Sequence, residues 1–201
     1  MSKIEVDTIE PQSGTSLTLG ASGDTITIPS GATLDGSSAT LTGLASTNGI
    51  TMVNQWRVNT TFSNNGTNDI TSNWEQVDTG GYGNIGSNMT ESSGVFTFPT
   101  TGIYYIIFKT QGRANGGART SGGGRIRVTT DNSSYSLASL SANDATADLY
   151  NFNAFTDHVF DVTDTSTHKV VFQAHSSNDA YFDNDTASSY NSVLFLRLGD
   201  T

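Results

Sequence analysis

The chain has 201 residues, enough for one or two domains with a substantial buried core. Nineteen acidic and nine basic residues give a net charge of −10, which argues against nucleic-acid binding, because phosphate recognition needs clustered Lys and Arg. The absence of cysteine excludes both a disulfide framework and a thiol nucleophile.

The first eleven residues predict a short strand that ends at a proline. Ile4 and Val6 alternate with charged residues, and Pro11 ends the pattern because it has no backbone N–H to donate. The early charges occupy the place where a secretion signal needs its apolar core, and no later stretch has the ~20 apolar residues of a membrane helix. We therefore expect residues 1–11 to be an attachment segment, in a protein made in a cytoplasm and not inserted into a membrane.

Residues 12–50 contain no aromatic residue and few apolar ones. Pairs such as Leu17/Leu19 and Ile26/Ile28 lie in Ser/Thr-rich stretches that are separated by glycines. Alternate residues line one face of a strand, and a single chain has too few of them to bury that face. Three chains around one axis could bury them together, as stacked repeats do. This pattern predicts a short fibrous β stalk, with a disordered polar leader as the alternative.

From residue 51 the sequence changes to short strand-like runs separated by turns, and all the aromatic residues lie in this part. No window shows a helical period with capping residues. Eight to ten strands in this length predict an all-β fold, an antiparallel sandwich over residues 51–201. The expected strands cover Trp56–Val58, Trp74–Val77, Val95–Phe98, Gly102–Lys109, Arg125–Thr129, Tyr135–Leu140, Leu149–Val162, Lys169–Ala174 and Ser192–Leu198.

The segment Gly94–Phe108 is the most informative part of the chain. It places two strands around the turn Pro99-Thr100-Thr101-Gly102, where proline fixes φ and glycine permits a tight corner. Within Ile103–Phe108 both alternating sets of side chains are apolar, so both faces of that strand need a partner. One face can fill the sandwich core, and the simplest partner for the other is a second subunit.

An Arg- and Gly-rich run occupies residues 112–125, with six glycines and the arginines Arg113, Arg119 and Arg125. It lacks the Gly-Lys-Ser/Thr ending of a phosphate-binding loop. The run predicts either a flexible connection with structural arginines or a mobile loop that presents guanidinium groups to carboxylate or phosphate groups of a surface glycan. Tyr181, in the later stretch 178–185, is a further candidate for ligand binding.

Two groups of residues raise the possibility of a metal or of catalysis. His158, His168 and His175 lack the spacing that places two ligands on one metal ion, and we expect them to be structural. Near the C-terminus the stretch 178–185 carries three aspartates. It is compatible with a solvated polar loop, with a calcium site or with a catalytic carboxylate pair. The aspartates are Asp179, Asp183 and Asp185.

The order Gly-x-Phe-x-x-Pro-x-x-Gly-x-Tyr-x-x-x-Phe over Gly94–Phe108 resembles the signature of complement component 1q-like head domains, which share the jelly roll of the tumour-necrosis-factor family. The closing run Ser188–Leu196 is similar to the last strand of these heads. The resemblance implies a homotrimeric jelly roll with buried aromatic residues near its axis and loops displayed at its tip. The residues assigned to the core or the trimer contact are Phe96, Phe98, Tyr104, Tyr105, Phe108, Tyr190, Leu194 and Leu196.

Together these patterns indicate a structural appendage protein of a bacterial virus rather than an enzyme, since no catalytic motif is present. The N-terminal segment also resembles leaders of tail fibres of marine bacterial viruses. We expect a virion protein that is anchored to other virion proteins by its N-terminus and displays a trimeric head for adhesion to a glycan or protein of the host surface. The alternatives are a capsid-surface head fibre, a glycan-binding lectin and a glycan-cleaving head. No cofactor is expected, apart from the calcium already considered.

Overall fold

The computed structural model describes residues 8–33, 49–116 and 120–201, and the chain divides into two units, residues 1–45 and 46–201. Residues 8–33 contain no strand, and every one of them is exposed. The structure of these residues is limited to isolated turns. In one of them the backbone N–H of Ala21 donates to Asp24 Oδ2 at 2.7 Å. A single chain therefore leaves the apolar pairs of this segment in water, and the trimeric stalk stays a prediction. The attachment residues 1–7 and the remaining leucines (Leu34, Leu41 and Leu44) lie outside the described residues.

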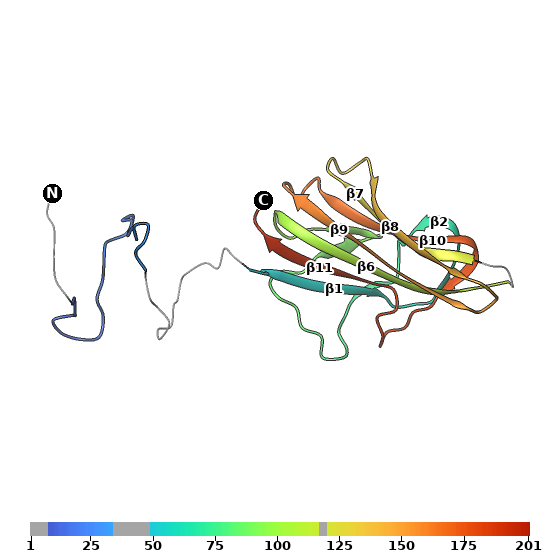
Figure 1. Ribbon diagram of the computed structural model, residues 1–201, viewed down its shortest axis with the longest axis horizontal. Helices are drawn as coiled ribbons and strands as arrows, with labels where there is room; N and C mark the ends of the chain where they lie inside the picture. Colours follow the sequence, from blue (N-terminus) through green and yellow to red (C-terminus); the bar gives the residue numbers. More distant parts are fainter. Residues whose placement is uncertain (1–7, 34–48, 117–119) are drawn as a thin grey trace. The chain divides into compact units, whose positions relative to one another are not determined.

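The second unit is an antiparallel β sandwich (Figure 1), and the described residues of the chain include no helix that is long and apolar enough to span a membrane. Its strands are β1 (Met52–Val58), β2 (Phe62–Asp69), β3 (Trp74–Gln76), β4 (Thr90–Ser92), β5 (Val95–Thr97), β6 (Gly102–Ala114), β7 (Thr120–Thr129), β8 (Ser136–Ala145), β9 (Asn151–Val162), β10 (Lys169–Phe182) and β11 (Ser192–Gly199).

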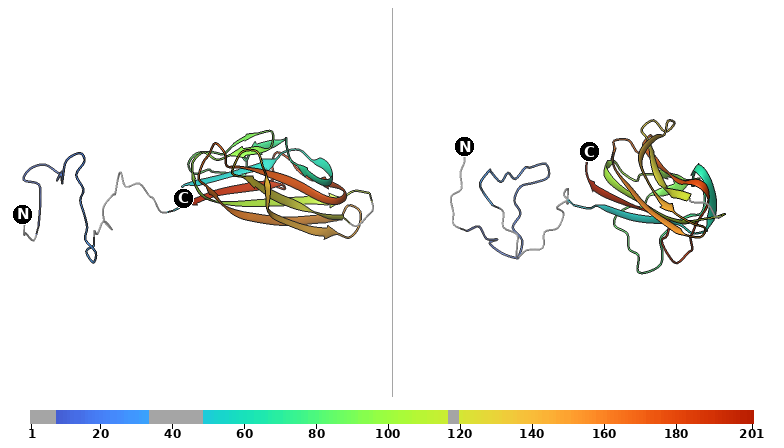
Figure 2. Two further views of the ribbon diagram at one scale, coloured as in Figure 1. Left: turned by 90° about the horizontal axis from the view of Figure 1, so that it is seen from above. Right: turned by 45° about the vertical axis from the view of Figure 1, so that its right-hand side comes forward.

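The strands form two layers, which are visible edge-on in Figure 2. The first layer has the order β3-β1-β11-β6-β9. In the second layer β10 is central, with β7 and then β8 on one side and β2, β5 and β4 on the other. The last residues of β10 also pair with the end of β6, so the two layers join at that end. This arrangement is a nearly closed jelly roll, as the sequence predicts.

The pairing sets the two ends of the sandwich apart. Met52 pairs with Arg197, so the start of β1 and the end of β11 lie at one end. At the other end Arg113 pairs with both Asn151 and Tyr181. The end of β6, the start of β9 and the end of β10 therefore lie at this second end, which we call the distal end (Figure 1).

Aromatic rings fill the space between the layers. Phe96 is fully buried and makes edge contacts with Trp74 and Phe172, with ring centroids 5.1 and 5.4 Å apart. The Tyr104 ring lies 4.6 Å from that of Phe98, and its hydroxyl donates to Thr100 O in the turn before β6. Phe96, Phe98, Tyr104 and Phe108, which the sequence assigns to the core or the trimer contact, are all buried between the two layers.

Several strands differ from their predicted extent. Phe62–Asp69 and Thr90–Ser92 were not expected as strands, because their sequences are almost entirely polar. The largest correction concerns the glycine run, since β7 begins at Thr120 and includes Gly122, Gly123 and Gly124. These glycines serve packing, because an added Cβ at any of them would collide with neighbouring atoms. The collision at Gly122 would be with the ring of the buried Phe152.

Candidate functional site

The outward face of the first layer carries an apolar patch that four strands share. Alternation along β6 turns Tyr104, Ile106 and Phe108 into the core and Ile103, Tyr105 and Ile107 outward. Cross-strand pairing then aligns Val53, Leu196, Tyr105 and Val159 in one row and Leu194 and Ile107 in the next. We define the apolar patch as Val53, Ile103, Tyr105, Ile107, Phe155, Val159, Leu194, Leu196 and Leu198.

This patch leaves more apolar surface in water than a solvated sheet face normally does. Phe155 is 63% exposed and Val159 is 56% exposed, although both lie in the regular middle of β9. Contiguous apolar patches of this kind mark interaction sites on soluble proteins. Leu194, Leu196 and Tyr105 lie on this outward face, whereas Tyr190 is half-buried in the connection that precedes β11.

The Tyr105 hydroxyl, the polar side-chain group of the patch, is paired with a neighbouring carboxylate. The Tyr105 hydroxyl donates to Asp157 Oδ2 at 2.7 Å, across the diagonal between β6 and β9. This hydrogen bond raises the pKa of the Tyr105 hydroxyl above its ordinary value, and partial desolvation and the Asp157 charge act in the same direction. Tyr105 therefore stays neutral at physiological pH and presents a ring whose polar end is already satisfied.

The edge of the first layer is held by a buried arginine. Arg57 of β1 is 1% exposed, and its guanidinium donates to Glu75 on β3 at 2.6 Å and to Asp78 at 2.7 Å. Next to it, Gln55 N donates to the Tyr82 hydroxyl at 3.0 Å, so the segment after β3 covers the free side of β1. A buried arginine with two carboxylate partners fixes this edge in one geometry.

At the distal end the structure brings two of the predicted ligand-binding residues together. Arg113, near the end of β6, pairs with Tyr181 of β10, and its guanidinium lies 5.0 Å from the centre of the tyrosine ring. Arg113 Nε also donates to Asp183 Oδ1 at 3.1 Å. The guanidinium is thus stacked and paired within the chain, which fits a structural role in joining the two layers.

The other predicted arginines do not join this group. Arg125 lies in the middle of β7, opposite Gln173, where its Nε is buried without a hydrogen-bond partner and its Nη2 lies 3.5 Å from His175 Nδ1. Arg119 lies outside the described residues. The expected mobile loop of guanidinium groups is therefore wrong for Arg113 and Arg125, since both belong to strands.

The three aspartates of the acidic stretch have separate partners. Asp179 Oδ1 accepts from Asn65 Nδ2 at 2.7 Å, Asp183 pairs with Arg113, and Asp185 Oδ1 accepts from the backbone N–H of Ala187. Asp179 and Tyr181 belong to β10, not to a loop. Across the described ranges no three His, Asp or Glu side chains are close enough to hold a metal ion, so the calcium hypothesis gains no support.

The histidines take structural positions. The His168 ring is buried, stacks on Phe160 at 5.5 Å between centroids and lies within hydrogen-bond reach of Thr163 and Thr167. His175 Nδ1 lies 2.8 Å from Thr67 Oγ1. Burial lowers the pKa of His175, and the nearby Arg125 charge lowers it further, while burial likewise lowers the pKa of His158.

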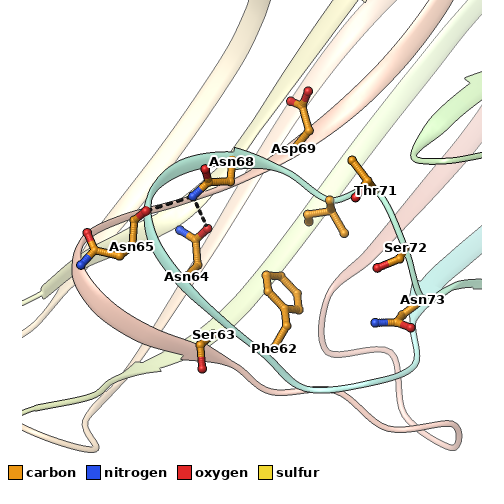
Figure 3. Close-up of a pocket in the computed structure, with 10 residues that line it drawn as sticks. Phe62, Ser63, Asn64, Asn65, Asn68, Asp69, Thr71, Ser72 and Asn73 are labelled. Carbon is orange, nitrogen blue, oxygen red and sulfur yellow. Dashed lines mark hydrogen bonds between the residues drawn. The ribbon is translucent and has the colours of Figure 1, made fainter.

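A polar pocket that the sequence does not signal lies where β2 curls toward the segment before β3 (Figure 3). Its volume is about 230 Å³, and residues 62–65 and 68–73 line it. Two apolar side chains, Phe62 and Ile70, contribute to the lining, and the remainder is Ser, Thr, Asn and Asp. The Asn side chains of this pocket are scattered through a strand and a turn and form no sequence motif. The pocket is therefore found only from the curled path of β2 in the structure.

Comparison with known proteins identifies the fold. No protein-family model matches the sequence, and no curated protein does. The chain is similar to the solved structure of Eiger TNF from S. frugiperda, with 9% identity, coverage of 77% of this chain and 96% of that one, and a TM-score of 0.53. It is also similar to murine APRIL at pH 8.0, with 10% identity, coverage of 73% and 98%, and a TM-score of 0.51.

These two likenesses confirm the predicted fold class, a jelly roll of the tumour-necrosis-factor type. At such identities they concern the fold alone. The PRD1 vertex protein P5 is similar over 76% of this chain and 100% of that one, with 13% identity. Its TM-score of 0.40 is too low for an inference about fold or function.

Proposed function

We propose that the chain is a non-enzymatic structural protein whose jelly-roll head assembles as a homotrimer through the apolar patch. The observation that carries the proposal is the outward row Val53–Leu196–Tyr105–Val159, which is apolar across four of the five strands of the first layer. Water would solvate such a surface poorly, and burial stabilises by roughly 25 cal/mol for each Å² of apolar area removed from water.

The sandwich resembles heads that assemble around a three-fold axis, and this resemblance favours three subunits over two. The covered outer edge of β1 supports the same arrangement. Because the Arg57 network holds the segment after β3 against β1, the layer is closed at that edge, and its face is the surface that remains for a neighbour. A sheet with a protected edge associates through side chains rather than by adding strands.

We further propose a place for this head in a bacterial virus, as a tail-fibre or receptor-binding appendage that adheres to the host surface. The contrast between the two units supports this role. Residues 8–33 bear exposed Leu and Ile pairs with no core of their own, as expected of a segment that becomes buried only with other copies or other virion proteins. The alternative, a fibre on the capsid surface, would use the same N-terminal segment for attachment and the same head for display.

Adhesion without catalysis is the proposed activity of the head. The acidic residues that could have formed a catalytic pair are engaged elsewhere, since Asp183 pairs with Arg113 and Asp179 accepts from Asn65. Both carboxylates therefore stabilise the distal end. A glycan-cleaving head would instead need two acids facing one cleft.

The mass of the full chain in solution tests the assembly. We expect a particle of about three times the 21.2 kDa chain mass by light scattering and native mass spectrometry at micromolar concentration. Leu196→Glu should yield a folded monomer, because it places a charge at the centre of the patch. Leu140→Glu is the matched control, since Leu140 is an exposed leucine on β8 of the other layer and its replacement should leave the mass unchanged.

A wild-type monomer, or a trimer that tolerates Leu196→Glu, would contradict the proposed interface. Immunogold labelling of infected host cells and of purified viral particles tests the location separately. We expect label on particle appendages, and label confined to the host cell would rule out the virion role.

A further inference from the structure

The polar pocket inside the curl of β2 has a fixed backbone. Ile70 N donates to Phe172 O at 2.9 Å, and Ile70 O accepts from the Trp74 indole at 2.8 Å. At the far end of the segment, Asn73 O accepts from Asn59 N at 2.9 Å. Both ends of the turn that lines the pocket are therefore anchored, and a ligand would not have to order it.

The opposite wall is held by one buried amide. Asn64 Nδ2 donates to Gly66 O and to Ser176 Oγ, both at 2.9 Å, so the curl of β2 is tied to β10. Asn64 Oδ1 accepts from Asn68 Nδ2, also at 2.9 Å (Figure 3). Asn64 is thus fully used in shaping the pocket, and it orients Asn68 as well.

The groups that remain around the pocket are free to bind. Asn68 donates twice, to Asn64 and to Asn65 O, which leaves its Oδ1 as an acceptor. The side chains of Thr71, Ser72 and Asn73 make no hydrogen bond within the described residues. Figure 3 shows the Ser72 and Asn73 side chains directed into the curl. A fixed frame with unused donors and acceptors on one side is the arrangement of a preformed polar binding site.

The lining selects the chemical class of the ligand. Hydroxyl and amide groups donate and accept in about equal measure, as a sugar ring requires, and the apolar Phe62 and Ile70 can contact its C–H groups. No Lys or Arg lines the pocket, and Asp69, its only charged residue, already accepts from Gln173 Nε2 at 2.8 Å. A volume of about 230 Å³ lies below the usual range of ~300–1,000 Å³ for larger ligands, which suits a single ring.

We propose that this pocket binds one uncharged sugar residue of a surface glycan. The inference rests on the proposed adhesive function and supplies its binding site and ligand class. In a trimer three such pockets act together, so that weak single-sugar binding becomes effective adhesion through multivalency.

Ligand-observed saturation-transfer NMR on the full chain tests the site. The probes are the methyl glycosides of glucose, galactose, mannose and N-acetylglucosamine, with N-acetylneuraminic acid as the acidic comparator. We expect saturation transfer to at least one neutral glycoside and weaker transfer to the acid. The double variant Ser72→Ala/Asn73→Gly should raise the dissociation constant at least tenfold.

The chain offers a matched control for this variant. Asn73 has a φ of 64° and Asn132, in the β7–β8 turn, has a φ of 56°, so glycine suits both backbones. Asn132→Gly should bind the glycoside as the wild type does. Equal binding by the pocket variant, preference for the acid, or no transfer to any neutral probe would overturn the proposal.

Mass measured on the same samples separates the two proposals. A trimer that binds no sugar would overturn the pocket and leave the assembly standing. A monomer that binds sugar through Asn73 would overturn the proposed assembly and leave the pocket standing. The two outcomes are independent because the pocket lies on β2, outside the apolar patch.

Discussion

The two layers of the sandwich share one aromatic core but present different outward faces. In the first layer the outward residues of the first half of β6, together with Leu194 and Leu196 of β11, are apolar. In the second layer Arg125, Arg127, Gln173 and His175 occupy outward positions. Arg127 illustrates the difference, since its guanidinium donates to Tyr135 O at 2.7 Å and lies 3.8 Å from Asp69 Oδ1. The Arg127 charge on the second layer is therefore paired within the chain.

The difference shows what a strand pattern can reveal about assembly. Both layers follow the same period of two, so burial of the inward set decides the fold in each. The outward-facing side chains are not needed for the fold. Their chemistry therefore indicates whether each face lies against solvent or against another protein. An apolar outward set indicates a protein partner, and a charged one indicates solvent.

The largest expected effect comes from placing a charge on the first layer. Tyr105→Glu would put a carboxylate beside Asp157, where a hydroxyl now donates at 2.7 Å, and would place two like charges in the proposed interface. We expect the trimer to dissociate to a third of its mass in light scattering, with the circular dichroism spectrum of a folded head.

Tyr105→Phe is the matched control for this prediction. It keeps the ring and removes only the hydroxyl, so the trimer should persist. A stable trimer carrying Tyr105→Glu would show that the outward face of the first layer is not the subunit interface, and that it does not differ from the second layer in this respect.

The next effect concerns the core that both layers share. Phe152→Ala removes a ring that is 1% exposed, and we expect a loss of about 3–5 kcal/mol in the free energy of unfolding. Gly122→Ala should cost about 1–3 kcal/mol, because its Cβ would collide with that ring. In the Phe152→Ala background the second change should cost much less, since the collision is gone.

Urea unfolding of the four proteins measures this coupling, and the Leu196→Glu background removes any contribution from assembly. Additive costs would mean that Gly122 does not make room for Phe152.

The sequence was sufficient to predict the strands in which apolar side chains occupy both the inward and the outward alternating positions. Ile103–Phe108 and Val193–Leu196 predict strands with one buried and one outward set, and the structure places them side by side in the first layer. The resemblance carried by Gly94–Phe108 adds the fold class. Phe62–Asp69 could not be predicted, because β2 is held by backbone pairing with β10 and by one ring, Phe62, that stacks on Phe182 at 5.2 Å.

The candidate sites depend on which residues face one another across paired strands. This register cannot be read from the sequence. Arg113 and Tyr181 are neighbours because β6 and β10 pair at their ends, and no local pattern links them. The glycines of β7 predict mobility from sequence alone, because the atoms that crowd them lie on other strands: Phe152 of β9 at Gly122, the backbone of β8 at Gly123, and Phe108 and Thr110 of β6 at Gly124. The polar pocket is hidden for the same reason, since the curl of β2 places Asn64 and Asn73 on opposite sides of one pocket.

The smallest expected effect is a pH dependence that belongs to the second layer. Burial and the Arg125 charge lower the pKa of His175 below its ordinary value of about 6.5, so the unfolded chain binds a proton more readily than the folded one. Stability should therefore be complete above that value and fall as the pH drops below it.

His175→Gln removes this titration and can keep the contact with Thr67. Between about pH 7.5 and 5.5, the urea midpoint of the variant should fall less than that of the wild type. Some dependence should remain, because burial also lowers the pKa of His158 in the first layer. Asp131 and Asp164 have pKa values lowered by hydrogen bonds from nearby N–H and hydroxyl groups, so both stay ionised over this range and do not contribute. Equal shifts of wild type and variant would show that the second layer tolerates a charged His175, which would remove one of its differences from the apolar face.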